Sequence, residues 1–266
     1  MAEQEKVRLG GMALANGVLV HGPTAWACAV RTDAGEIKVA SGRKRLFASR
    51  VTAPFLRGPL RLAEAFAFLP EVRRRLPEAR FPFERPSVLA ATFASAATVQ
   101  VVRRSPGLSD AARELLSGAL ALTPALLALR GGELAAYHGA EHVSIGSYEH
   151  GETRAKEHER CGSHLIGPLL AATAAGNMIA SRAPVQLRGA ARAASAIGSV
   201  GVAVEIFSWM ARHPEHPLAR ALAKPGHELQ HRIGTADPSP EQLEVAEAAL
   251  AACLELEDER GDRAKD

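Results

Sequence analysis

The chain has 266 residues, of which 47% are hydrophobic and 23% charged, an ordinary balance for a globular protein with a buried core. A net charge of +3 is too small to indicate nucleic acid as a partner, and we expect none. Three cysteines, Cys28, Cys161 and Cys253, exclude a disulfide framework and indicate a reducing compartment such as the cytoplasm.

The first forty residues carry the pattern of β structure. Short apolar runs, GVLVHG, AWACAVRT and EIKVAS, are separated by the turn-forming sequences GP and DAG. Ile37 and Val39 alternate with polar neighbours, as expected for a strand that is buried on one side. Gly35 can adopt the positive φ that a hairpin turn at 33–35 requires. We therefore predict short antiparallel β-strands within residues 1–50.

From residue 51 the pattern changes to that of helices. We predict helices over 59–76, 87–103, 109–130, 133–146, 163–181, 188–213 and 216–232, with Gly and Pro between them. A last helix begins with Ser239 as its N-cap, Pro240 at its first position and Gln242 completing a capping box. The sequence thus predicts an α+β, mostly α fold in one integrated domain. The N-terminal strands pack on an Ala-rich multi-helix bundle, 51–257, and a charged tail, 258–266, is frayed.

Two long segments raise the question of membrane insertion. Residues 86–102 and 161–181 contain no Asp, Glu, Lys or Arg, and both are long enough to be considered as spans. Because Ser, Thr, Gly and other residues dilute them, we interpret both as buried core helices. The residues MAEQEKVRLGG lack an apolar run, so we expect no signal peptide and a cytoplasmic protein. The alternative is a membrane-associated or integral membrane protein, since Ala- and Gly-rich helices pack closely in a bilayer.

The motif that carries chemistry is HGAEH at 138–142. Residues four apart share one face of a helix, so His138 and His142 can bind the same ion. The spacing H-x-x-E-H is that of a zinc-protease motif, in which the histidines are ligands and the glutamate, here Glu141, is the general base. We therefore predict a divalent metal ion, and zinc suits imidazole ligands. Gly139 is unfavourable inside a helix, unless it lets another segment approach closely.

A catalytic zinc ion needs a third protein ligand. One candidate is Glu205, a single carboxylate in the apolar stretch VGVAVEIFSW, which a salt bridge to an arginine would also explain. The others are His158 and Cys161, which are three residues apart, although Cys161 could equally be a buried inert thiol. Tyr148 and Glu149 follow the motif closely and are candidates to support the ligands or to contact substrate.

Several motifs, in this order, resemble those of a known family: GGMALANGVLVHGP, AVRTDAGEI, LRG at 56–58, YHGAEH with YE at 137–149, H-x-R-C-G at 158–162, and DPSPEQLEVAEAAL. From about residue 8 to residue 255 the chain resembles the YqhQ-like bacterial family, a domain of unknown function described as a predicted metal-dependent enzyme. The resemblance implies relatives with several membrane spans. It also implies a metal site built from His138, Glu141 and His142, with His158, Arg160 and Cys161 nearby.

The sequence as a whole predicts a metal-dependent enzyme, and more specifically a hydrolase of a small-molecule or peptide substrate. His138 and His142 hold the ion, Glu205 or the pair His158 and Cys161 completes the ligands, and Glu141 activates water. One alternative is a non-catalytic helical protein that binds a membrane surface or a partner. Another is a purely structural zinc site closed by Cys161. The number of protein ligands separates them, since three leave a position open for water and four do not.

Overall fold

The computed structural model of the protein describes residues 6–44, 48, 51–129 and 132–263. Its strands form one antiparallel sheet in the order β1 (Gly10–Leu14), β2 (Gly17–His21), β3 (Ala25–Arg31) and β4 (Ile37–Arg43). The prediction of β2, β3 and β4 is confirmed, and Gly35 in the last turn has a φ of +84°. Strand β1 is not predicted by its sequence, because GGMAL contains two glycines and no β-branched residue.

The α-helices of the described residues follow the predicted order, and the α+β, mostly α class is confirmed. They are α1 (Arg57–Ala67), α2 (Leu69–Arg75), α3 (Pro86–Arg104), α4 (Asp110–Leu129), α5 (Glu133–His150), α6 (Ile166–Ser181), α7 (Arg188–Arg212), α8 (Pro217–Leu229) and α9 (Pro240–Arg263). The prediction of a single helix over 59–76 is wrong, since the helix is interrupted at Phe68. Pro70 explains the break, because proline is tolerated only in the first turn of a helix, here that of α2.

The last helix begins as predicted and ends later than predicted. The backbone N–H of Ser239 donates to Gln242 Oε1 at 2.9 Å, and Ser239 Oγ accepts from the Gln242 N–H at 3.3 Å, so the capping box is confirmed. Helix α9 continues to Arg263, although the tail after Glu257 was expected to fray. Glu257 anchors this end, because its carboxylate accepts the backbone N–H groups of Thr24 and Ala25, each at 2.7 Å.

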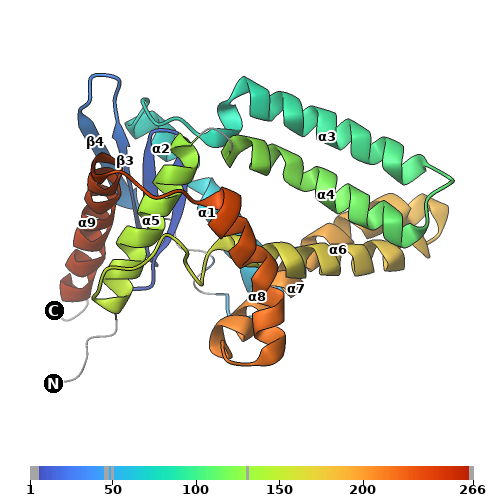
Figure 1. Cartoon of the computed structure of the whole chain (residues 1–266). Coiled ribbons are helices and arrows are strands. Elements are labelled where there is room, and N and C mark those ends of the chain that lie inside the picture. The colour runs from blue at the N-terminus through green and yellow to red at the C-terminus, as the bar shows by residue number, and fades with distance from the viewer. Residues whose placement is uncertain (1–5, 45–47, 49–50, 130–131, 264–266) are drawn as a thin grey trace.

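The two faces of the sheet are covered by different helices (Figure 1). On one face, Val18, Val20, Ala27 and Ala29 pack against α5 and α9. On the other face, the cluster consists of side chains from the strands, from α2 and from the segments beside it: Leu14, Leu19, Trp26, Cys28, Val30, Phe68, Leu69, Val72 and Leu76. The sheet therefore holds α5, the helix that carries HGAEH, in a fixed position.

Helices α3, α4, α6 and α7 form what we call the helical arm, which extends away from the sheet in Figure 1. It consists of two antiparallel hairpins, α3–α4 and α6–α7, and Asn177 of α6 joins them by donating to Glu114 of α4 at 2.9 Å. Large apolar side chains on all four helices are exposed: Phe93 by 73%, Leu115 by 76%, Ile179 by 68% and Ile197 by 63%.

The interpretation of 86–102 and 161–181 as buried core helices is wrong. Only Val88 and Ser95 are buried in α3, and only Pro168 and Ala180 in α6. Among the described residues, two other segments are long and apolar enough to cross a membrane, Ala112–Leu129 and Val185–Arg212. Only 11% and 22% of the residues in the most apolar 18-residue window of each segment are buried.

Candidate metal centre

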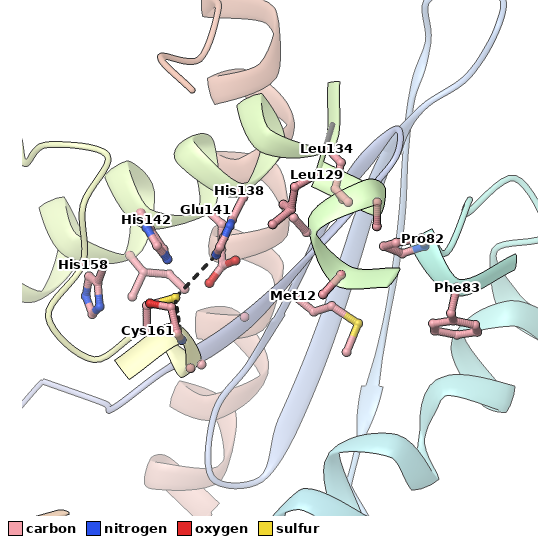
Figure 2. Close-up of a pocket in the computed structure, with 18 of the residues that line it drawn as sticks. Met12, Pro82, Phe83, Leu129, Leu134, His138, Glu141, His142, His158 and Cys161 are labelled. Carbon is pink, nitrogen blue, oxygen red and sulfur yellow. Dashed lines mark hydrogen bonds between the residues drawn. The ribbon is translucent and has the colours of Figure 1, made fainter. Parts of the chain in front are cut away.

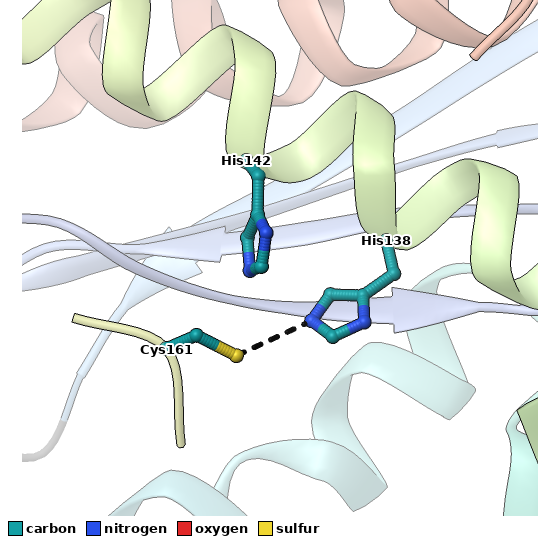
Figure 3. A group of neighbouring side chains, drawn as sticks. All are labelled: His138, His142 and Cys161. Atoms are coloured by element: carbon teal, nitrogen blue, oxygen red, sulfur yellow. Dashed lines mark hydrogen bonds between the residues drawn. The ribbon is translucent and has the colours of Figure 1, made fainter. Parts of the chain in front are cut away.

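The structure brings three of the predicted ligands together. His138 and His142 on α5 and Cys161 each offer a donor atom, and these atoms lie within 4.8 Å of one another. The Nε2 atom of His138 is 3.6 Å from the Sγ atom of Cys161, and the two imidazole centroids are 4.4 Å apart. Figure 3 shows both histidines pointing from α5 toward Cys161, which comes from a different segment of the chain. We call these three residues the His/Cys group.

Backbone carbonyls orient both imidazoles. His138 Nδ1 donates to the carbonyl of Gly234 at 2.7 Å, and His142 Nδ1 donates to that of Lys156 at 2.6 Å. A carbonyl oxygen only accepts, so the proton of each neutral ring is on Nδ1 and the lone pair is on Nε2. Burial lowers the pKa of His142 to about 3, with a further contribution from His138, so this ring is neutral at physiological pH. Metal-ligating histidines have this arrangement.

The third donor, Cys161, sits immediately before a short 3-10 helix, Gly162–Leu165, whose first turn it caps. Its Sγ atom accepts the backbone N–H of Ser163 at 3.5 Å. Burial raises the pKa of the Cys161 thiol, and the contact with Ser163 partly offsets this effect. Two imidazole nitrogens and one thiolate are ligands that zinc accepts. The residues present therefore fit a zinc ion with three protein ligands.

Glu141 is buried between α5 and strand β1, on the cavity side of the sheet edge. A Cβ atom at Gly11 of β1 would lie 2.4 Å from Glu141 Oε1, so only glycine leaves room for the carboxylate. Burial raises the pKa of Glu141 to about 7, although the nearby His138 opposes this shift. A carboxylate with this pKa can both accept and release a proton at neutral pH.

The His/Cys group and Glu141 form one end of a cavity of about 660 Å³. Figure 2 shows His138, Glu141, His142, His158 and Cys161 gathered at this end, with Met12, Pro82, Phe83, Leu129 and Leu134 toward the other. The cavity is therefore polar where the candidate ligands lie, and most of its other lining residues are apolar. A volume of this size accommodates a small organic molecule.

Glu205 does not lie with the His/Cys group. Its carboxylate is bound by the Arg57 guanidinium through two hydrogen bonds, of 2.8 and 2.5 Å, and it also accepts the backbone N–H of Phe55 at 3.3 Å. The alternative explanation, a salt bridge to an arginine, is confirmed. Glu205 thus links α7 to the first residues of α1. The third donor of the His/Cys group is Cys161.

His158, predicted as a ligand together with Cys161, lies outside the His/Cys group. His158 Nε2 lies 3.3 Å from Glu149 Oε2, and Arg160 also pairs with Glu149. His158 and Arg160 line the cavity, and Glu149, which contacts both side chains, is not among the lining residues. Tyr148 is not among the lining residues, and its hydroxyl accepts the backbone N–H of Val7 at 3.2 Å. Tyr148 thus fixes the N-terminal segment and does not contact a molecule in the cavity.

Sequence reasoning misses three contributors to the site. The carbonyls of Gly234 and Lys156 carry no sequence signal, because every residue has a carbonyl group. Gly11 does carry one, since the pair Gly10-Gly11 is unusual in a strand and glycine there indicates a close approach. The close approach expected at Gly139 is confirmed, since a Cβ atom there would lie 2.1 Å from the carbonyl oxygen of Ala236.

We expect Gly139→Ala to destabilise the protein by about 1–3 kcal/mol, the usual effect of overpacking. The added methyl group would displace Ala236, whose N–H donates to the Ala135 carbonyl at 2.9 Å, and with it the nearby carbonyl of Gly234 that orients His138. The shift in melting temperature measures this effect. Gly198→Ala, in a helix with open space around the added atom, is the matched control and should be neutral or stabilising. Equal stability of both variants would contradict the prediction.

Comparison with known proteins places the His/Cys group inside a recognised sequence region. Residues 133–256 match the family model described as "Protein of unknown function (DUF1385)". This region begins at α5 and ends within α9, so it contains His138, Glu141, His142 and Cys161, while the sheet and the α3–α4 hairpin precede it. The match is consistent with the YqhQ-like resemblance. No curated protein and no solved structure matches the chain.

Proposed function

We propose that the protein is a metal-dependent hydrolase whose ion, most suitably zinc, is held by His138, His142 and Cys161. The observation that carries the proposal is the orientation of the two imidazoles. Each Nδ1 atom is bound to a backbone carbonyl, which leaves each Nε2 lone pair free for an ion beside the Cys161 thiol. A set of three protein ligands leaves one position of a tetrahedral ion open, as catalytic zinc sites require.

The proposed reaction divides the work between the ion and Glu141. Zinc at this site would supply a Lewis acid and lower the pKa of a water molecule that it coordinates. Glu141 lies one residue from His142 and lines the same cavity, so it is placed to take the proton from water. From the same position it would return this proton to the leaving group.

Two features favour a catalytic site over a purely structural one. In the described part of the chain the group offers three donors, and a structural zinc site uses four. The donors also face a cavity of about 660 Å³, whereas structural sites are closed. A non-catalytic membrane- or partner-binding protein has no need of two oriented imidazoles beside a buried carboxylate.

Elemental analysis tests the proposal directly. We expect about one transition-metal ion per chain, which a chelator removes and added zinc restores, because three protein donors suffice for tight binding. The protein is purified without added metal, and circular dichroism checks that it is folded. A folded preparation that holds far less than one ion per chain, and takes none up, would overturn the proposed function.

We further propose that the helical arm lies in a lipid bilayer. The exposed apolar side chains occur on all four helices of the arm, and together we call them the apolar belt. Helix α3 has 19 residues, which correspond to about 28 Å at 1.5 Å per residue, close to the hydrocarbon thickness of about 30 Å. Arginines gather where the outer ends of the two hairpins meet: Arg103, Arg104, Arg113, Arg182, Arg188 and Arg192.

Contacts inside the arm support the same conclusion. Small residues lie between α6 and α7, where a Cβ atom at Gly176 would lie 2.1 Å from Ser195 Oγ. The side chain of Leu170 from α6 likewise packs directly against Gly118 of α4. Helices in bilayers associate through small residues, because the hydrophobic effect does not favour moving large apolar side chains from lipid into a helix–helix interface.

Fractionation of cells that produce the full chain tests the bilayer proposal. We expect the protein to stay in the membrane pellet after washes with alkaline carbonate and with high salt, since its apolar belt contacts lipid tails. A surface-bound protein would be released, because only screened charges would hold it. Release of most of the protein by either wash would contradict insertion of the arm.

A further inference from the structure

We propose that the substrate is amphipathic, with a single apolar chain that fills the cavity between α3, α4 and β1 and a hydrolysable polar group at the His/Cys group. This inference rests on the proposed hydrolase function and names its substrate class. It follows from the two unlike ends of the cavity and from where the apolar end leads.

The apolar end is built from residues that offer almost no hydrogen bonds. Its lining comes from β1, from the segment before α3, and from α3, α4 and α5: Met12, Ala13, Pro82, Phe83, Val88, Pro124, Ala125, Ala128, Leu129 and Leu134. The Thr92 hydroxyl, also in the lining, already donates to the Val88 carbonyl at 2.8 Å. The side chains here offer few partners for the backbone N–H and C=O groups of a peptide, whereas a hydrocarbon chain needs none.

The apolar end reaches the base of the helical arm. Val88 and Thr92 come from the first turns of α3, and Pro124, Ala125 and Ala128 from the last turns of α4. Thr92 and Ala125 line the cavity and are exposed to solvent, so the cavity is open at this end. The neighbouring Phe93 is 73% exposed and belongs to the apolar belt. A chain anchored in the bilayer can therefore enter the cavity between α3 and α4 without crossing water.

The hairpin is fastened beside this point of access. Pro124 has no N–H, so the carbonyl of Leu120 lacks its usual partner within α4. The buried Ser95 of α3 supplies the missing bond, because its hydroxyl donates to the Leu120 carbonyl at 2.5 Å. The two helices are therefore held together about one turn beyond the lining residues Thr92 and Pro124.

Binding of acyl hydroxamates to the zinc-loaded full chain in lipid nanodiscs tests the inference. The hydroxamate chelates the ion, and the acyl chain, varied from acetyl to decanoyl, probes the cavity. We expect the affinity, measured by calorimetry, to rise about fourfold for each added methylene until the cavity is full, since burial of one methylene contributes about 0.8 kcal/mol. A peptidyl hydroxamate of similar size should bind no better than the acetyl compound.

Two threonine variants of α3 separate the cavity from general effects of the membrane. Thr92→Trp places an indole in the cavity, so we expect it to bind acetohydroxamate normally and to lose the dependence on chain length. Thr98→Trp is the matched control, because Thr98 is also exposed and its hydroxyl also donates at 2.8 Å to the carbonyl four residues earlier, but it does not line the cavity. It should behave like the wild type.

The outcomes distinguish this inference from the function on which it rests. An affinity that does not change with chain length, or one that rises equally in Thr92→Trp, overturns the proposal that the substrate has an apolar chain. The proposed hydrolase function still stands in that case, provided that the protein binds the metal and acetohydroxamate. Tighter binding of the peptidyl compound would indicate a peptidase instead. A chain that holds no zinc overturns the function itself. Labelling of α3 and α4 by a diazirine phospholipid in the nanodisc supports entry of the substrate from the bilayer. If only a soluble diazirine hydroxamate labels these helices, entry from the bilayer is overturned.

Discussion

Glu141→Gln is expected to lower the hydrolytic rate by about 10²- to 10⁴-fold and to leave the metal content at its wild-type value. Glutamine keeps the size and the hydrogen bonding of glutamate but cannot accept a proton. The site is tight, since Gly11 leaves just enough room for this side chain, so an isosteric change is the appropriate one. Elemental analysis and the rate of cleavage of a chromogenic acyl ester measure the two properties on the same preparation.

Glu133→Gln is the control for Glu141→Gln. Glu133 also lies on α5, but it is exposed at the first turn, where Gln242 Nε2 donates to it at 3.2 Å. We expect full activity and full metal content. If Glu141→Gln instead lost its metal as completely as a variant of a ligand, the carboxylate would itself be a ligand or a structural element, and its role as general base would be wrong.

Removal of any member of the His/Cys group is expected to abolish metal binding and activity together. His138→Ala and His142→Ala each leave two protein donors, and Cys161→Ser replaces a strong thiolate ligand by a weak hydroxyl. We expect metal affinity to fall by more than about 100-fold, beyond the 10- to 100-fold effect of losing a group that merely orients a ligand. Competition with a metal-binding dye measures the affinity, and circular dichroism checks the fold.

His150→Ala is the matched control for the ligand variants. His150 is also on α5, and its Nδ1 atom also lies at hydrogen-bond distance, 2.9 Å, from a backbone carbonyl, that of Gly146. It is not in the His/Cys group, so we expect it to keep both metal and activity. Equal metal loss in His150→Ala and His142→Ala would mean that helix stability, and not ligation, explains the effect.

The local features of the fold could be predicted from the sequence because they depend on neighbours in the chain. Alternation identified the strand β4, and four-residue spacing placed His138 and His142 on one face of α5. The Ser239 capping box is equally local, since its partner is three residues away. Each of these predictions uses only the geometry of one helix or strand.

Predictions that depended on distant residues were less successful. Glu205 was correctly identified as unusual, but its partner, Arg57, is 148 residues away, and composition alone does not distinguish a salt bridge from a metal ligand. Cys161 and the two histidines meet only because the segment after α5 folds back over it. The prediction that the apolar segments of α3 and α6 are buried failed for a related reason: hydropathy does not show whether another part of the chain covers a side chain.

The bond between Glu257 and the first residues of β3 has a consequence for how the chain acquires its structure. It joins positions 233 and 232 residues apart, and α9, which it anchors, covers the same sheet face as α5. During synthesis, the sheet appears first, α5 appears between the two hairpins of the helical arm, and α9 appears last. Such long-range contacts make folding slow, and the sheet face that α9 covers stays exposed until α9 has been synthesised. We therefore expect chains stopped before Glu257 to depend on chaperones and to aggregate, even though they contain every ligand of the His/Cys group.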